Sequence, residues 1–200
     1  MKGLVPISGY MKINITENTP TVLRFTLSGA SVNTANALRR LAINSVPTFA
    51  IDSVTFYENS TSMFDEYVAH RLGLIPLATP KGYDEKDEAV LSADFEGPGT
   101  LYSRDLKSSD KAVKVANEDI PIIKLAEGQR LKFDGKAILR TGIISSKFQP
   151  GLVTYSQSED GKTFDFYIES FGQMHAKDIL DRTLAVAHED MKEIQKAIKK

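Results

Sequence analysis

The chain of 200 residues contains no cysteine. This absence excludes disulfides, thiol nucleophiles, cysteine-ligated zinc and iron–sulfur clusters together. Only three histidines are available as bases or metal ligands, and His70, His175 and His188 are scattered along the chain. The sequence therefore predicts that this chain binds no cofactor and no metal ion.

The chain also lacks a charge excess of either sign and any long apolar run. Its 25 lysines and arginines against 26 aspartates and glutamates give a formal net charge of -1, so no overall basic field is present to attract a nucleic-acid backbone. No apolar run approaches the ~20 residues of a membrane-spanning helix, and no secretory signal pattern opens the chain. We expect no direct DNA binding, no membrane contact and a cytoplasmic location.

Recognisable catalytic motifs are missing as well. The sequence has no Gly-x-Ser-x-Gly elbow, no glycine-rich phosphate loop and no His-Glu-x-x-His pair. A compact aspartate cluster, which could hold catalytic metal ions, is also absent. A hydrolase that uses His70 with Asp65 stays open as a hypothesis, but the sequence favours a chain with no catalytic residues.

What the chain does have is an ordinary globular composition, 42% hydrophobic and 26% charged, enough for one large domain or two small ones. Apolar and polar residues alternate over 23–27, which predicts a strand with one buried face. Ser31 or Asn33 can cap the helix that follows, and Pro47 ends it.

Further elements follow from similar patterns. Residues 51–59 are typical of a strand, and Ser60–Ser62 can cap a helix that ends at Gly73. The polar and acidic residues 78–94 predict an exposed loop. Residues 93–155 indicate short strands, separated by turns at 97–99, 127–128, 134–135 and 150–151. Asp160 and Gly161 indicate the turn of a hairpin.

The clearest pattern is a heptad seam near the end of the chain, where apolar residues are spaced by four and three residues in turn. The seam consists of Leu180, Leu184, Ala187, Met191, Ile194 and Ile198. A helix over residues 176–200 would be about 36 Å long, which is more than a small sheet covers. An amphipathic helix on its own sheet is the alternative, but this length favours a partner helix packed on the seam.

Leu38, Leu41 and Ala42 form a narrower apolar stripe on the first predicted helix, and Arg39 and Arg40 lie beside it. Paired arginines on an exposed face often contribute only solubility and a small helix-dipole effect. Arginine is also enriched at interfaces, because its planar fork suits carboxylates and carbonyls. Both interpretations stay open on the residues alone.

Several sequence blocks match a known family in order and spacing. They are Asn36–Arg40, Val46–Asp52, Ala69–Leu77, Tyr102–Leu106, Ile120–Gln129, Lys147–Gly151 and Phe166–Gly172. Together they resemble the alpha-like subunit of multisubunit RNA polymerases, specifically the archaeal D subunit. The same family is similar to the N-terminal region of the bacterial alpha subunit and to the third-largest subunit of eukaryotic polymerase II. The resemblance runs from about Met11 to the C-terminus.

The resemblance implies an α+β fold, in which an alpha-subunit-like dimerisation domain of an antiparallel sheet and two helices holds an inserted, mainly β domain. We expect residues 1–50 and 156–200 to form the discontinuous dimerisation domain and residues 51–155 to form the insert. The ferredoxin-like iron–sulfur domain of many archaeal relatives is expected to be missing or without its clusters, because the chain has no cysteine.

The resemblance further implies a non-catalytic assembly subunit of archaeal DNA-dependent RNA polymerase. The seam and the stripe would pack against subunit L, and this heterodimer would be the platform for the two large catalytic subunits and the small subunits N and P. Arg39 and Arg40 match paired arginines that contact a large subunit. His70 and Arg71 match a block with a structural and docking role.

The chain departs from the family at two positions. Relatives typically have Gly-x-x-His-x-Lys-Trp where this chain has Ser145 for the histidine and Phe148 for the tryptophan. Residues Met1–Tyr10 precede the similar region, and we assign them no function. Two alternatives stay open, namely a homodimeric interaction module outside transcription and the equivalent subunit of eukaryotic polymerases I and III.

Overall fold

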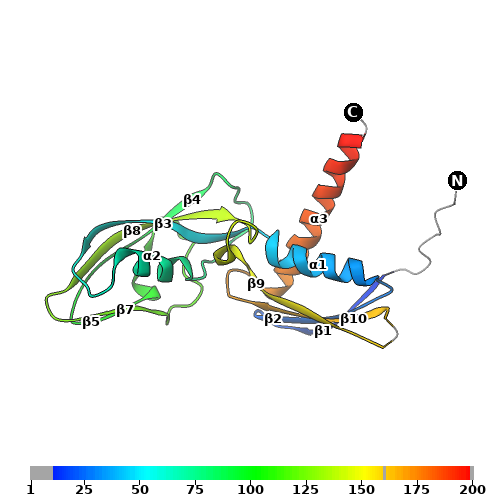
Figure 1. Ribbon diagram of the computed structural model, residues 1–200, viewed down its shortest axis with the longest axis horizontal. Coiled ribbons are helices and arrows are strands. Elements are labelled where there is room, and N and C mark those ends of the chain that lie inside the picture. Colours follow the sequence, from blue (N-terminus) through cyan, green and yellow to red (C-terminus); the bar gives the residue numbers. More distant parts are fainter. Residues whose placement is uncertain (1–10, 160, 199–200) are drawn as a thin grey trace.

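The chain folds into two lobes with separate hydrophobic cores, as shown by a computed structural model that describes residues 11–159 and 161–198 (Figure 1). The two ends of the chain together form the first lobe, and the middle of the chain forms the second. Residues Met1–Tyr10 and Asp160 lie outside the described residues.

The first lobe is a four-stranded antiparallel sheet covered on one face by two helices. Its strands follow the order β1-β2-β10-β9, with bounds Lys12–Asn18 for β1, Val22–Ser28 for β2, Gly151–Gln157 for β9 and Thr163–Ser170 for β10. The helices are α1 (Val32–Asn44) and α3 (Ala176–Ile198). Alternate residues of the central strands face the helices, and the rings of Phe25 and Phe166 stack there with centroids 4.9 Å apart.

The sequence prediction of the first strand and helix is confirmed. Leu23, Phe25 and Leu27 are buried, and they alternate with more exposed neighbours on β2. Ser31 is the N-cap of α1, because its hydroxyl accepts a hydrogen bond from the Thr34 amide. The hairpin around Gly161 is also confirmed, since β9 and β10 pair on either side of it.

The second lobe contains two antiparallel sheets and one helix. The larger sheet has the order β3-β8-β4-β6, with bounds Thr48–Asn59 for β3, Glu88–Glu96 for β4, Lys107–Ser108 for β6 and Arg130–Arg140 for β8. The smaller sheet pairs β5 (Gly99–Tyr102) with β7 (Pro121–Leu125), and α2 (Asp65–Gly73) packs between β3 and β7. Two short 3-10 turns, η1 (Ser103–Asp105) and η2 (Ser146–Phe148), complete this part of the chain.

Three local predictions in the second lobe are wrong. Residues 88–94 belong to β4 rather than to a loop, and Ala89, Leu91 and Ala93 are buried in the core. The residue pair 134–135 lies within β8 instead of forming a turn. Finally, α2 begins after Phe64 with no side-chain cap, so Ser60–Ser62 do not cap it.

The boundary between the lobes differs from the one drawn on the sequence. β9 begins at Gly151 and pairs with β10 along its length, so residues 151–155 lie in the sheet of the first lobe. Val153 of this strand is part of the first hydrophobic core. The sequence pattern did not separate β9 from the preceding short strands, because its turn at residues 150–151 resembles the turns of the insert.

Thr79 joins the two lobes through hydrogen bonds on both sides. Its hydroxyl accepts from the Phe49 amide at 3.0 Å in the second lobe. Its own amide donates to the Gln173 carbonyl at 2.7 Å, and its carbonyl accepts from Nη2 of Arg182 at 2.7 Å in the first lobe. These contacts fix one lobe against the other.

The expected fold class is confirmed, since the chain combines antiparallel sheets with three α-helices. Among the helices of the described residues, none has the length and apolar character needed to cross a membrane.

Candidate subunit interface

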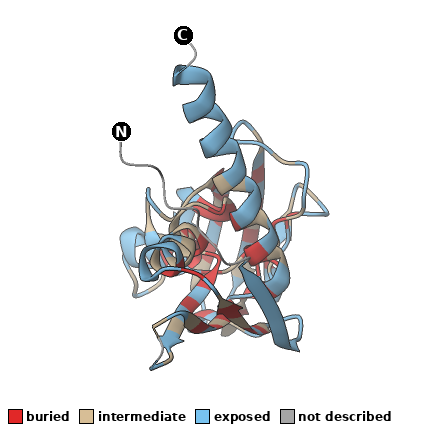
Figure 2. Cartoon of the chain, turned by 90° about the vertical axis from the view of Figure 1, so that its right-hand side faces the viewer, coloured by how far each residue is buried: buried red, intermediate tan, exposed pale blue. Residues whose placement is uncertain are grey.

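The seam of α3 runs from the core of the first lobe into solvent. Leu180 is only 5% exposed and belongs to the chain's own core, so this residue is not on the surface predicted for a partner. Ala187 is half-buried. The remaining four seam residues are exposed large apolar side chains, namely Leu184, Met191, Ile194 and Ile198. Figure 2 shows the same change along the helix, with the last turns exposed on all sides.

The polar side of α3 forms its own ion pairs. Lys192 contacts Glu189 at 3.2 Å, and Lys196 contacts Glu193 at 2.6 Å. All four residues lie at heptad positions away from the seam. Pairs of this kind contribute about 0.3–0.5 kcal/mol each to a helix, so they stabilise the projecting turns without covering the apolar side.

The stripe predicted on α1 is mostly turned toward the chain's own core. Ala42 is fully buried and Leu38 packs against the core of the first lobe, so a partner cannot cover Ala42. Leu41 is half-buried and lies in a groove on the other side of α1. The physical reason is that α1 must cover the sheet of its own lobe, which uses the most apolar side of the helix.

A further apolar surface on β1 was not singled out from the sequence. Ile13 pairs with Leu27 and Ile15 pairs with Phe25, so both isoleucines share the helix-covered face of the sheet. Both nevertheless remain more than 40% exposed, because α1 and α3 pack mainly on the other strands of the sheet. The alternation of Ile13 and Ile15 with Lys12 and Asn14 is the sequence signal that could have identified them.

The paired arginines of α1 differ in their surroundings. Nη2 of Arg39 donates to Oδ1 of Asn36 at 3.0 Å, one turn earlier on the same helix. Arg40 is exposed and lines the groove that also contains Leu41. Of the two, Arg40 is therefore the one available for an outside contact.

Arg71 is engaged within the chain. Its Nε donates to the Ile122 carbonyl at 2.7 Å and its Nη2 donates to the Pro121 carbonyl at 2.8 Å, which ties the end of α2 to β7. His70, the other docking residue predicted from the same block, is exposed at the surface of α2. The block containing them is chiefly a core segment, because Leu72 and Leu77 are fully buried.

The hydrolase hypothesis finds no support in the geometry. Asp65 accepts a hydrogen bond from Nδ2 of Asn59 at 2.7 Å. His70 follows five residues later on α2, which places the two side chains roughly 140° apart around the helix. Across residues 11–159 and 161–198, no group of three or more histidine and carboxylate side chains is arranged to hold a metal ion.

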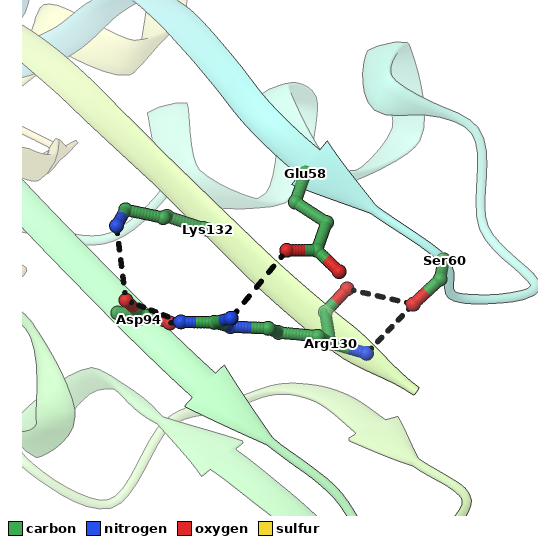
Figure 3. Close-up of polar contacts among 5 residues, drawn as sticks. All are labelled: Glu58, Ser60, Asp94, Arg130 and Lys132. Carbon is green, nitrogen blue, oxygen red and sulfur yellow. Dashed lines mark hydrogen bonds and ion pairs between the residues drawn. The ribbon is translucent and has the colours of Figure 1, made fainter. Parts of the chain in front are cut away.

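The outer face of the larger sheet carries a cross-strand network of charges (Figure 3). Arg130 on β8 forms two hydrogen bonds of 2.9 Å with the carboxylate of Asp94 on β4, and Lys132 contacts the same carboxylate at 3.1 Å. These hydrogen bonds, first from Arg130 and then from Lys132, lower the pKa of Asp94. Glu58 on β3 lies 3.7 Å from Arg130. Because carboxylates hold both cations, the two are not a free basic patch for a nucleic-acid backbone.

The two positions that depart from the family have different environments. Phe148 is fully buried, and its carbonyl accepts a hydrogen bond of 2.7 Å from the Thr48 hydroxyl. The phenyl ring thus fills a position in the core. Ser145 is half-buried and precedes η2 without making a side-chain cap.

Comparisons with known proteins give a consistent picture. Residues 50–153 match the model of the RNA polymerase Rpb3/RpoA insert domain. The chain is 49% identical to the DNA-directed RNA polymerase subunit Rpo3 of Pyrococcus furiosus over 152 residues, covering 72% of this chain and 58% of that relative. It is 44% identical to the Rpo3 subunit of Methanocaldococcus jannaschii over 157 residues, covering 78% of this chain and 80% of that relative. The chain thus spans little more than half the length of the Pyrococcus relative.

Proposed function

Because this chain belongs to the Rpb3/RpoA family of RNA polymerase subunits, we propose that it is a non-catalytic assembly subunit of an archaeal DNA-directed RNA polymerase. The chain would contribute to nucleotidyl transfer only through the complex, and it would provide neither a cofactor nor a metal site. The blocks shared with the archaeal D subunit and the lack of a catalytic motif support this role.

The observation that carries the proposal is the uncovered apolar surface of the first lobe. Four seam residues on α3 are exposed. Ile13 and Ile15 on β1 are exposed as well, although they lie on the face of the sheet that the helices cover elsewhere. Burying one such side chain fully is worth about 1.5–3 kcal/mol. A partner that covers several of them would therefore bind stably, and an exposed surface of this kind is typical of an interface.

We assign this surface to subunit L, the smaller partner of the family, in a one-to-one heterodimer. The heterodimer is then the platform on which the two large catalytic subunits and the small subunits N and P assemble. The hydrogen bonds of Thr79 to both lobes support this role, because they connect the second lobe to the lobe that carries this surface.

Native mass spectrometry of the tagged chain, purified from its own cells, tests the proposal. We expect a one-to-one complex with a chain of smaller mass, together with a large assembly that contains the two catalytic subunits. Met191→Glu combined with Ile194→Glu should abolish both species, because two charges cannot be buried in an apolar interface. Glu189→Gln combined with Lys192→Gln, on the other side of α3, is the matched control and should leave both intact.

A homodimer without polymerase subunits would contradict the proposal and favour the interaction-module alternative. The same holds if the charged seam variant assembles as well as the control.

A further inference from the structure

The joint between the lobes brings three segments of the chain together at Gln173. This residue lies between β10 and α3 and is only 5% exposed. Its carbonyl accepts from the Thr79 amide at 2.7 Å, and its Nε2 donates to the Gln149 carbonyl at 3.1 Å. Gln173 therefore holds both the segment between α2 and β4 and the segment that leads into β9.

Arg182 reaches the same place from α3, where its Nη2 donates to the Thr79 carbonyl at 2.7 Å. The amide nitrogen and the carbonyl oxygen of one residue are separated by only three covalent bonds. Because Gln173 binds the amide of Thr79 and Arg182 binds its carbonyl, the two residues belong to one cluster around Thr79.

Two buried atoms of this cluster are left without a hydrogen bond. Over residues 11–159 and 161–198, the buried side-chain nitrogen and oxygen atoms that have no hydrogen-bond partner are Oε1 of Gln173 and Nε of Arg182. Buried polar groups are nearly always paired in folded proteins, because leaving one unpaired is unfavourable. Since both exceptions come from residues bound to Thr79, they indicate a small ligand that the two atoms share.

The hydrogen-bonding character of both atoms is determined by their other contacts. The Gln149 carbonyl can only accept, so the NH2 group of Gln173 must face it and the amide oxygen must face away. Oε1 is therefore an acceptor, whereas Nε of Arg182 is a donor with one hydrogen. The shared ligand must both accept and donate a hydrogen bond.

This requirement excludes an ion of either sign. An anion would pair with Nε but be repelled by Oε1, and a cation would pair with Oε1 but be repelled by the guanidinium. Asp178 acts electrostatically on Arg182, but its Oδ1 pairs with Lys81 at 2.9 Å. A water molecule accepts and donates, and buried waters typically make about 2–4 hydrogen bonds to groups that are otherwise unpaired.

We propose that an ordered internal water molecule binds at the joint, where it accepts from Nε of Arg182 and donates to Oε1 of Gln173. A bridging water is enthalpically nearly as good as a direct hydrogen bond, so it stabilises the contact of α3 with the segment before it and completes the cluster around Thr79. The inference does not depend on the function proposed above, because the site involves this chain alone.

A crystal structure of the purified full chain, at a resolution that shows ordered waters, tests the site directly. We expect a water oxygen within about 2.7–3.2 Å of both Nε of Arg182 and Oε1 of Gln173. A direct hydrogen bond between these two atoms, an ion in place of the water, or no density between them would overturn the proposal.

Nuclear magnetic resonance tests whether the water stays bound in solution. We expect a cross-peak between Hε of Arg182 and water, with nuclear and rotating-frame Overhauser effects of opposite sign, which distinguishes a long-lived water from chemical exchange of the proton. Arg71 is the matched control, because its Nε already donates to the Ile122 carbonyl at 2.7 Å, and its Hε should give no such cross-peak. No cross-peak from Arg182, or equal cross-peaks from both arginines, would contradict the proposal.

A glutamine variant tests whether both atoms hold the water. Gln173→Met removes the acceptor with little change in side-chain volume, so the cross-peak between Hε of Arg182 and water should disappear. Gln157→Met is the control, because it removes an exposed glutamine whose Nε2 also donates to a backbone carbonyl, that of Gly161. An unchanged cross-peak in Gln173→Met, or its loss in both variants, would overturn the proposal. The crystal structure and the wild-type spectrum decide the question even if Gln173→Met does not fold, because they need no variant.

Discussion

Arg71 connects two elements of the second lobe through a single side chain. Its guanidinium donates to the carbonyls of Pro121 and Ile122, so it anchors the end of α2 to β7. Hydrogen bonds with a charged donor are worth about 1.5–3 kcal/mol, less at an exposed site. We predict that Arg71→Ala lowers the free energy of unfolding by about 1–2 kcal/mol, measured by urea denaturation of the complex-free chain.

His70 is the neighbouring control for this prediction, because it is exposed on the same turn of α2. His70→Ala should change the free energy of unfolding by less than about 0.5 kcal/mol. If Arg71→Ala also left the free energy of unfolding unchanged but weakened assembly, the side chain would be a docking residue, as the family resemblance implies. The anchoring role would then be wrong.

Asp94 gives the second lobe a dependence on pH. Its hydrogen bonds with Arg130 and Lys132 lower its pKa in the folded chain below the ordinary value of 3.8. A carboxyl group with a lowered pKa stabilises the fold above that ordinary value, and this stabilisation is lost as the pH falls through the folded pKa. We predict that the melting temperature of Asp94→Asn is below that of wild type at neutral pH, and that the difference shrinks below pH 3.8. A difference that is constant across this range would show that Asp94 acts through packing rather than charge.

At the scale of elements, α3 consists of an anchored half and a free half. The buried residues of this helix all lie between Ala176 and Thr183, whereas every residue from His188 to Ile198 is exposed. Isolated helices shorter than about 12–15 residues are marginal in water. The free half therefore depends on its connection to the anchored half and on whatever covers the seam.

We predict that amide hydrogens of residues 188–198 exchange rapidly in the dilute, isolated chain and at least roughly tenfold more slowly in the purified polymerase. Hydrogen exchange followed by mass spectrometry checks this, with β8 as the internal control because it is a central strand of its sheet. Equal exchange of residues 188–198 in both samples would mean that no partner covers the seam.

Elements with a strong local pattern were predictable from the sequence, and those set by distant contacts were not. β2 and α1 have clear apolar periods and boundaries, and both were found. β4 was missed because its short alternation of buried and exposed residues directly follows a run of acidic residues that is typical of a loop. The strand is formed through its pairing with β8, which the local sequence does not show. Gly135 looked like part of a turn, but its place in β8 is explained by packing, since a Cβ there would lie 3.1 Å from the Ile51 side chain.

The same distinction applies to the candidate interface. The exposed seam residues on α3 followed from their spacing, but spacing could not show that Leu180 and Ala42 are used by the chain's own core. The alternation around Ile13 and Ile15 could place both on one apolar strand face, but it could not show that this face is exposed, because the exposure depends on how far two helices from elsewhere in the sequence extend over the sheet.

At the scale of the whole molecule, the joint between the lobes decides whether the chain can serve as a platform. Arg182 on α3 reaches across to the carbonyl of Thr79, and its burial lowers the pKa of its guanidinium from the usual value. A second contact, between Lys81 and Asp178 at 2.9 Å, is largely exposed. Exposed ion pairs contribute little, so of these two contacts the one made by Arg182 matters more for the direction of the second lobe.

We predict that Arg182→Met loosens the joint while both lobes stay folded, because the aliphatic part of the side chain is kept and the hydrogen bond to Thr79 is lost. Small-angle X-ray scattering of the purified chain should then show a larger maximum dimension, and proteolysis should cut more readily near residues 80–87. Lys81→Met, which removes only the exposed ion pair, is the control and should leave both measurements unchanged. If Arg182→Met scatters like wild type but assembles poorly with the large subunits, Arg182 contacts a partner instead. If scattering, proteolysis and assembly of Arg182→Met all match wild type, the backbone contact between Thr79 and Gln173 is sufficient to fix the lobes.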